Sequence, residues 1–118
     1  MSNAKTAIIV RPRISIGDSI SIGPGKIDLL QQIRETHSIS AAGRALGIPY
    51  KRAWLLIDSL NQGFGEPVVA TISGGKGGGG TSLTPLGEAL LDRYIALEER
   101  MNAASVKELD ALQKLAKY

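Results

Sequence analysis

The sequence contains no cysteine, and its only histidine is His37. Without cysteine there is no disulfide framework, no thiolate metal site and no thiol nucleophile. No apolar run approaches the roughly 18 residues that a membrane-spanning helix needs, and no charged segment leads into an apolar one as in a secretory leader. His37 has no companion histidine or cysteine, so we interpret it as a loop or phosphate-contact residue. We therefore expect a cytoplasmic protein without a metal or other cofactor.

Positive charge is concentrated in the first part of the chain. Residues 1–84 carry nine basic and five acidic side chains, whereas residues 85–118 carry five basic and six acidic ones. This asymmetry suggests a polyanionic partner for the first part, although a net charge of +3 on 118 residues is equally ordinary. The length suits one domain with an appended element. We place the boundary between residues 84 and 85, within a single compact unit.

Hydrophobic periodicity predicts a mainly α protein with a small β component. Ser38 or Ser40 is suited to begin the second helix, Gly47 to end it, and Pro49 to occupy the first position of the third. In chain order, the expected elements are strands within residues 13–22, helices at about 26–36, 38–46 and 48–61, strands at 68–72 and 81–84, and a long helix from 85 to nearly 118 that can break at 102–105.

The second and third expected helices have the pattern of a helix-turn-helix unit counted from Ile39. Its fifth residue, Gly43, lets the two helices approach closely, and its ninth, Gly47, forms the turn. An ordinary helical hairpin remains the alternative. Trp54 is expected in the core beside Ala53. The positions that form the interior of such a unit are apolar throughout: Ala42, Leu46, Ile48, Ala53 and Leu56.

The start of the third helix carries Tyr50, Lys51 and Arg52, where a recognition helix meets base edges and phosphates. Lysine and arginine pair with guanine acceptors in the major groove, and tyrosine contacts a phosphate or a thymine methyl group. The hydroxyls of Ser38 and Ser40 and the helix start beside them suit a phosphate. A solvated surface pair is the alternative for Lys51 and Arg52. The candidate DNA-binding residues are Ser38, Ser40, Arg44, Pro49, Tyr50, Lys51, Arg52, Lys76, Gly77, Gly78 and Thr81.

A glycine run with one lysine, GGKGGGG at residues 74–80, connects the last two expected strands. A phosphate-binding P-loop needs serine or threonine after its lysine, whereas Lys76 is followed by Gly77. The literal G-x-G-x-x-G match does not open a helix, as a dinucleotide site requires, so we expect no enzyme. A hairpin after a helix-turn-helix unit is a wing, whose tip would place Lys76, Gly77 and Gly78 against a DNA backbone. A nucleotide or oxyanion site in this loop is an alternative.

With these residues in this order, residues 13–95 resemble the N-terminal DNA-binding domain of ModE-type molybdate-responsive transcriptional regulators, which is related to the winged-helix domain of LysR-type regulators. The resemblance implies a winged helix-turn-helix with a long C-terminal helix that dimerises and binds a palindromic operator on double-stranded DNA. Pro49 stands where serine is common, which is expected to alter the first DNA contact. The stretches that carry the resemblance are KIDLL at 26–30, SISAA at 38–42, GIPYKRAW at 47–54, Asn61, the glycine run and Leu83-Thr84.

Members of that family carry molybdate-binding modules after the long helix, whereas this sequence reaches Tyr118 without one. We therefore expect a bacterial-type regulator that lacks a molybdate-binding module, with a separate effector-sensing partner. The sequence is then either a stand-alone regulator or a piece of a longer protein.

Apolar residues along the long helix are spread more widely than contact with one domain requires. A two-fold dimer interface accounts for this spread and would space two recognition helices about one DNA turn apart. The alternative is that the helix folds back onto its own domain. A second functional hypothesis is a protein-interaction module on a winged-helix scaffold that no longer binds DNA. The residues expected in the dimer interface are Leu86, Leu90, Tyr94, Leu97 and Met101.

Overall fold

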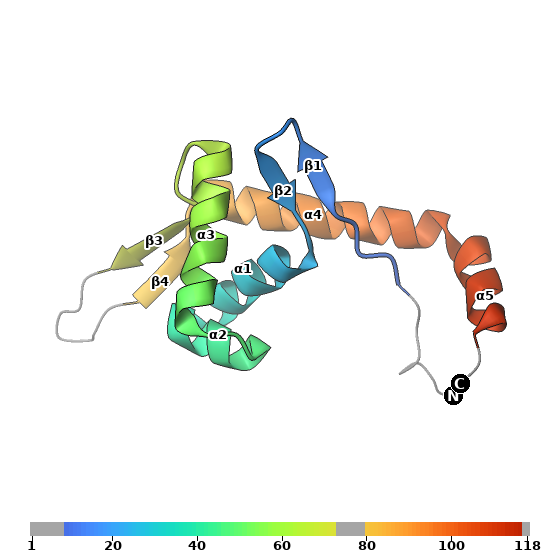
Figure 1. Ribbon diagram of the computed structural model, residues 1–118, viewed down its shortest axis with the longest axis horizontal. Helices are drawn as coiled ribbons and strands as arrows, with labels where there is room; N and C mark the ends of the chain where they lie inside the picture. The colour runs from blue at the N-terminus through green and yellow to red at the C-terminus, as the bar shows by residue number, and fades with distance from the viewer. Residues whose placement is uncertain (1–8, 73–79, 117–118) are drawn as a thin grey trace.

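The structure, a computed structural model, describes residues 9–72 and 80–116. Its helices and short antiparallel strand pairs confirm a mainly α protein with a small β component (Figure 1). In chain order, the elements are β1 (Ile14–Ile16), β2 (Ile20–Ile22), α1 (Pro24–Thr36), α2 (Ile39–Leu46), α3 (Tyr50–Phe64), β3 (Val69–Ile72), β4 (Gly80–Leu83), α4 (Pro85–Ala104) and α5 (Val106–Leu115).

Three helix boundaries differ from the sequence-based expectation. Helix α1 begins already at Pro24, because proline suits the first turn of a helix, where its missing N–H group is not needed. Pro49 caps α3 in an extended conformation instead of occupying its first helical position. Helix α3 also continues through the expected turn to Phe64, and Gly65 ends it in the left-handed conformation with φ 75°.

The core lies where α1, α2 and α3 meet the two hairpins and the first half of α4. Ala42 and Ala53 are fully buried, as expected, whereas Leu46, Ile48 and Leu56 are partly buried against the same core. The largest fully buried side chains are Leu29, Leu30, Ile33, Ile57, Leu60, Val68 and Leu91.

The turn between α2 and α3 uses both glycines as expected. Gly47 adopts a left-handed conformation with φ 71° at the end of α2. At Gly43, a Cβ atom would lie 3.0 Å from the carbonyl oxygen of Ile48, so the missing side chain lets α2 and the start of α3 approach closely. Of the two serines considered for the start of α2, Ser38 is the cap, since its Oγ accepts a hydrogen bond of 3.0 Å from the N–H of Ala41.

The second hairpin is fixed to the helices at its base. Strands β3 and β4 pair from Val69 opposite Leu83 to Ile72 opposite Gly80. The N–H of Thr81 donates to the carbonyl oxygen of His37 at 2.9 Å, which joins β4 to the turn between α1 and α2. The expected tip, with Lys76, Gly77 and Gly78, lies outside the described residues.

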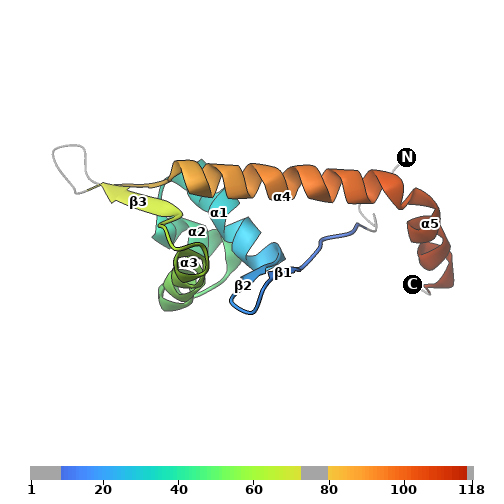
Figure 2. The ribbon, with the colours of Figure 1, turned by 90° about the horizontal axis from the view of Figure 1, so that it is seen from above.

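Helix α4 gives the molecule its long dimension. It extends from the β3–β4 hairpin at one end of the molecule to α5 at the other, and its first half runs alongside α1 (Figure 2). The helix breaks at Ser105, inside the segment expected to break. Within residues 9–72 and 80–116, no helix is long and apolar enough to cross a membrane.

Candidate nucleic-acid interface

Helix α3 turns one face into the core and a different face to solvent. Ala53 and Ile57 are buried, whereas Lys51 and Leu55, one helical turn apart, lie on the outward side. Leu55 is 56% exposed. The outward face of α3 therefore offers one cation and one apolar side chain to a partner.

A cleft of about 300 Å³ lies between the β3–β4 hairpin and the starts of α2 and α3. Four predicted DNA-binding residues line it together: Ser38, Ser40, Tyr50 and Thr81. The Tyr50 and Trp54 rings meet edge-on with centroids 6.4 Å apart. Trp54 thus lies at this cleft, only partly buried, and the expectation that it belongs to the core is wrong in that respect.

Arg52 lies on the other flank of α3. Two residues along a helix are separated by about 200° of rotation, so Arg52 points away from Tyr50 and lines a different pocket with Arg13 and Lys26. Arg44 and Pro49 are exposed outside both pockets. The predicted set is therefore divided by α3 and not gathered in one patch.

The cations around α2 and α3 are unpaired, whereas those facing α4 are neutralised. Among the residues that the structure describes, Arg44, Lys51 and Arg52 take part in no ion pair. Arg34 on α1, in contrast, lies 2.9 Å from Asp92 and 3.0 Å from Glu88. Hydrogen bonds to these carboxylates raise the pKa of Arg34. Arg44, Lys51 and Arg52 thus leave uncompensated positive charge on the surface of α2 and α3.

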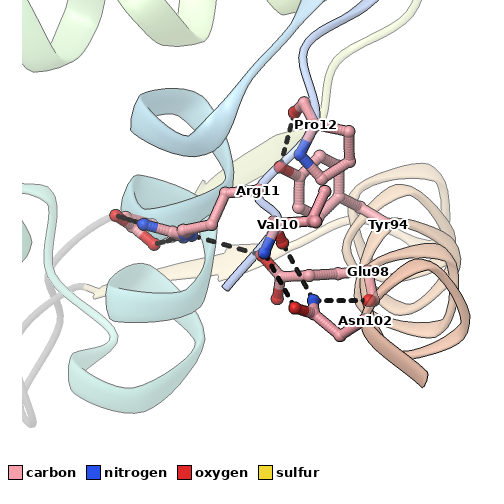
Figure 3. Close-up of polar contacts among 7 residues, drawn as sticks. Val10, Arg11, Pro12, Tyr94, Glu98 and Asn102 are labelled. Atoms are coloured by element: carbon pink, nitrogen blue, oxygen red, sulfur yellow. Dashed lines mark hydrogen bonds and ion pairs between the residues drawn. The ribbon is translucent and has the colours of Figure 1, made fainter. Parts of the chain in front are cut away.

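The segment before β1 ties α4 to the rest of the domain (Figure 3). Val10 exchanges two hydrogen bonds with the Asn102 side chain, of 2.7 and 2.9 Å. Arg11 bridges α1 and α4 because it pairs with Asp28 at 2.6 Å and with Glu98 at 3.2 Å. These bonds fix the direction of α4 relative to α1, and no pattern in the sequence predicted them.

Four of the five residues expected in the dimer interface line one apolar groove on α4. The groove has a volume of about 320 Å³ and is closed on its other side by β1, β2 and the end of α3. Tyr94 lies at its floor: the ring is 2% exposed, and its hydroxyl donates to the carbonyl oxygen of Pro12 at 2.6 Å (Figure 3). Burial raises the pKa of Tyr94. The four residues are Leu86, Leu90, Tyr94 and Leu97, and Met101 lies beyond the groove.

Several residues at these surfaces were missed from the sequence. Thr71 joins the cleft beside Tyr50, and Arg13 and Lys26 join Arg52. Their charge or polarity was visible, but only the fold brings them to α3. Within the described parts of the chain, no group of three histidine, cysteine, aspartate or glutamate side chains could hold a metal ion.

The sequence is similar to proteins named for molybdenum binding, molybdenum transport or transcriptional regulation. No protein-family model matches it. It is 42% identical over 93 residues to the molybdenum-pterin-binding protein MopB of Rhodobacter capsulatus. It is 31% identical over 121 aligned positions to the molybdenum transport protein ModE of Azotobacter vinelandii. It is 41% identical over 76 residues to the DNA-binding transcriptional dual regulator ModE of Escherichia coli K12.

These similarities cover much of this chain but a minor part of each relative. They take in 79%, 93% and 64% of the chain, and 33%, 45% and 29% of the three relatives, respectively. The chain therefore spans less than half the length of these proteins. Their names describe regulators and molybdenum-related binding or transport proteins, not enzymes. Nothing in the comparisons supports the expected lack of a molybdate-binding module.

Proposed function

We propose that this protein is a sequence-specific DNA-binding transcriptional regulator of the ModE type, in which α2, α3 and the β3–β4 hairpin act as a winged helix-turn-helix. The observation that carries the proposal is the exposed start of α3, where Lys51 and Arg52 have no ion-pair partner among the described residues. Similarity to proteins named ModE, one of them a DNA-binding regulator, supports a role in molybdenum-related regulation.

In this proposal α3 enters the major groove with Lys51 foremost, because Lys51 lies on the outward face of the helix. Tyr50 then faces the DNA strand on the side of the β3–β4 hairpin, and Arg52 faces the other DNA strand. Leu55 contacts apolar base edges such as thymine methyl groups. The phosphate contacts on the hairpin side come from Ser38, Ser40, Thr81 and the wing with Lys76, Gly77 and Gly78, while Arg44 and Pro49 lie at the edges of the contact.

We place the dimer contact along α4. A monomer would leave the apolar groove open and would expose Val106, Leu112 and Leu115 on α5 by 63%, 56% and 76%. In a two-fold dimer, the exposed Leu97 and the partly buried Leu86, Leu90 and Met101 would pack against a second copy, with Tyr94 supporting the groove from below. Two recognition helices would then face successive turns of a palindromic operator.

The test is a salt series of binding to random duplex DNA and to a palindrome selected from a random pool. We expect the selected site to bind far more tightly and Lys51→Ala to lose about 1–3 kcal/mol of that preference. Arg100→Ala is the matched control, because Arg100 is exposed on α4 away from α3 and carries the same charge. Equal, weak binding to every duplex, unchanged in Lys51→Ala, would refute the proposal.

One observation favours a different function, that of a protein-interaction module that no longer binds DNA. The exposed Leu55 and the apolar groove on α4 are both suited to an apolar protein partner. Salt separates the two functions, because phosphate contacts make DNA affinity fall steeply with salt concentration. Apolar contacts with a protein partner keep their strength under the same conditions.

A further inference from the structure

A second pocket lies beside α3, and its lining includes no residue of the β3–β4 hairpin. It has a volume of about 350 Å³ and receives one cation from each of three segments. Arg13 comes from the chain just before β1, Lys26 from the first turn of α1, and Arg52 from the first turn of α3. Leu46, Ile48 and Leu56 form its apolar wall. The fold therefore brings together three positive charges that are far apart in the sequence.

No carboxylate of the pocket is available to balance these cations. The pocket's own acidic residue, Asp28, is held by Arg11 through bonds of 2.6 and 3.3 Å. Arg13 and Arg52 have no hydrogen-bond or ion-pair partner among the side chains described in residues 9–72 and 80–116. The positive charges of side chains that line one pocket repel one another, and a bound anion would relieve this repulsion.

The position and the pKa of Lys26 are both affected by this pocket. Its ammonium group donates to the carbonyl oxygen of Ser21 at 2.8 Å and to Oγ of Ser59 at 2.9 Å, so it is fixed in place. Burial lowers the pKa of Lys26, and the positive charge of Arg13 lowers it further. A bound anion would offset both effects, because a nearby negative charge favours the charged ammonium group. The hydrogen bonds thus hold the ammonium group of Lys26 in a pocket whose positive charges have no unpaired carboxylate to balance them.

The backbone beside the cations leaves room for such an anion. A Cβ atom on Gly23 would lie 3.0 Å from a guanidinium nitrogen of Arg13, so the missing side chain lets Arg13 lie over the start of α1. That start has no side-chain cap and no acidic residue in its first turn. A side chain at Gly25, in contrast, would meet open space.

We propose that the pocket binds a tetrahedral oxyanion of the phosphate type, held by Arg13, Lys26 and Arg52. Two guanidinium groups and an ammonium group provide enough donors for the oxygens of one such anion. The anion can be a backbone phosphate of DNA bound along α3 or a free oxyanion. The site itself does not require that the chain bind DNA, and it is distinct from the glycine run.

The first arm of the test uses the whole chain and inorganic sulfate, whose charge does not change near neutral pH. We expect sulfate, compared with sodium chloride at equal ionic strength, to shift the backbone amide resonances at the start of α1 in a saturable manner. Because sulfate stabilises folded proteins in general, its effect on the melting temperature counts only where it exceeds the effect on Arg13→Ala. Arg13→Ala should weaken sulfate binding about tenfold, as for the loss of one charged hydrogen bond. Arg100→Ala, which removes an equal charge elsewhere, should leave it unchanged.

A second variant places a carboxylate in the pocket without disturbing the fold. Gly25→Asp meets open space and puts an acidic residue in the first turn of a helix, where it is favourable. We expect this variant to melt at a higher temperature than the wild type and to lose the sulfate-dependent shift of the amide resonances at the start of α1. A variant that still binds sulfate as the wild type does would contradict the proposal.

The second arm distinguishes the two sources of the anion. If a DNA phosphate occupies the pocket, Arg13→Ala should reduce the slope of log affinity against log salt by about 0.9, the value for one phosphate contact. An unchanged slope together with sulfate binding identifies a free oxyanion, also when the chain binds no DNA at all. If Arg13→Ala alters neither sulfate binding nor the salt slope, the site does not exist.

Discussion

Tyr94 belongs both to the core of its own chain and to a surface expected to meet a second one. The sequence placed it among apolar residues of a long helix and predicted an interface. The structure buries its ring and bonds its hydroxyl to Pro12, so that the leucines of the same helix are more accessible on the groove surface than Tyr94 is. Whether a residue faces its own domain or a partner depends on a segment far away in the sequence, and periodicity does not contain that information.

The hydroxyl of Tyr94 makes the stability of the protein depend on alkaline pH. Its pKa in the folded state is raised by burial, above the ordinary tyrosine value of about 10. As pH rises past that value, the unfolded chain releases the proton while the folded chain keeps it. The free energy of unfolding therefore falls as pH rises through the folded-state pKa.

We expect Tyr94→Phe to remove this component of the pH dependence and to lower the free energy of unfolding at neutral pH by about 1 kcal/mol, through loss of the hydrogen bond to Pro12. Urea unfolding at a series of pH values measures both effects. The tyrosinate absorbance titration of the folded protein should also lose the component that comes from Tyr94. A variant with the alkaline profile of the wild type would show that another residue is responsible.

Ser38 and Ser40 lie at the start of α2, and we expect one to contribute to stability and the other to DNA binding. Ser38 caps α2, whereas Ser40 is the exposed second residue of the helix, and both line the cleft beside Tyr50. Ser38→Ala should lower the free energy of unfolding by about 1 kcal/mol, because the N–H of Ala41 loses its acceptor. Ser40→Ala should leave stability unchanged and weaken DNA binding alone. Thermal melting and duplex binding of the two variants test this difference.

At the level of elements, local patterns predicted most of the fold. Gly47, the candidate cap Ser38 and the alternation around Gly17 are signals carried by a few adjacent residues, and each corresponds to a real helix end or turn. Pro49 and the end of α3 were placed less well, because a proline can precede a helix as readily as begin it, and α3 continues until Gly65 stops it.

The candidate site was predicted less completely than the fold. Tyr50 and Arg52 are only two residues apart in the sequence, but the rotation of α3 places them on opposite flanks. Arg13 reaches α3 only because β1, β2 and α1 fold against it. The hydrogen bonds from Val10 to Asn102 join residues at opposite ends of the chain, and no local pattern signals such a contact.

At the scale of the whole molecule, charge pairing and shape act together. Arg11 and Arg34 join α1 to α4 through carboxylates, which removes their charge from the outer surface and fixes the long helix. Helix α4 has 20 residues and is therefore about 30 Å long. That length is close to the spacing of about 34 Å between recognition helices on successive DNA turns. A rigid α4 would set this spacing in a dimer.

The proposed dimer contact can be tested at Leu97. Leu97 is 37% exposed at the edge of the apolar groove, so Leu97→Glu leaves the core intact but places a charge in the proposed contact. We expect the variant to sediment as a monomer and to bind the selected palindrome with the affinity of a single half-site, because burial of an unpaired carboxylate opposes association. Ala96→Glu is the matched control, since Ala96 is exposed outside the groove and next in sequence. If both variants keep the mass and the operator affinity of the wild type, the two copies do not meet along this groove.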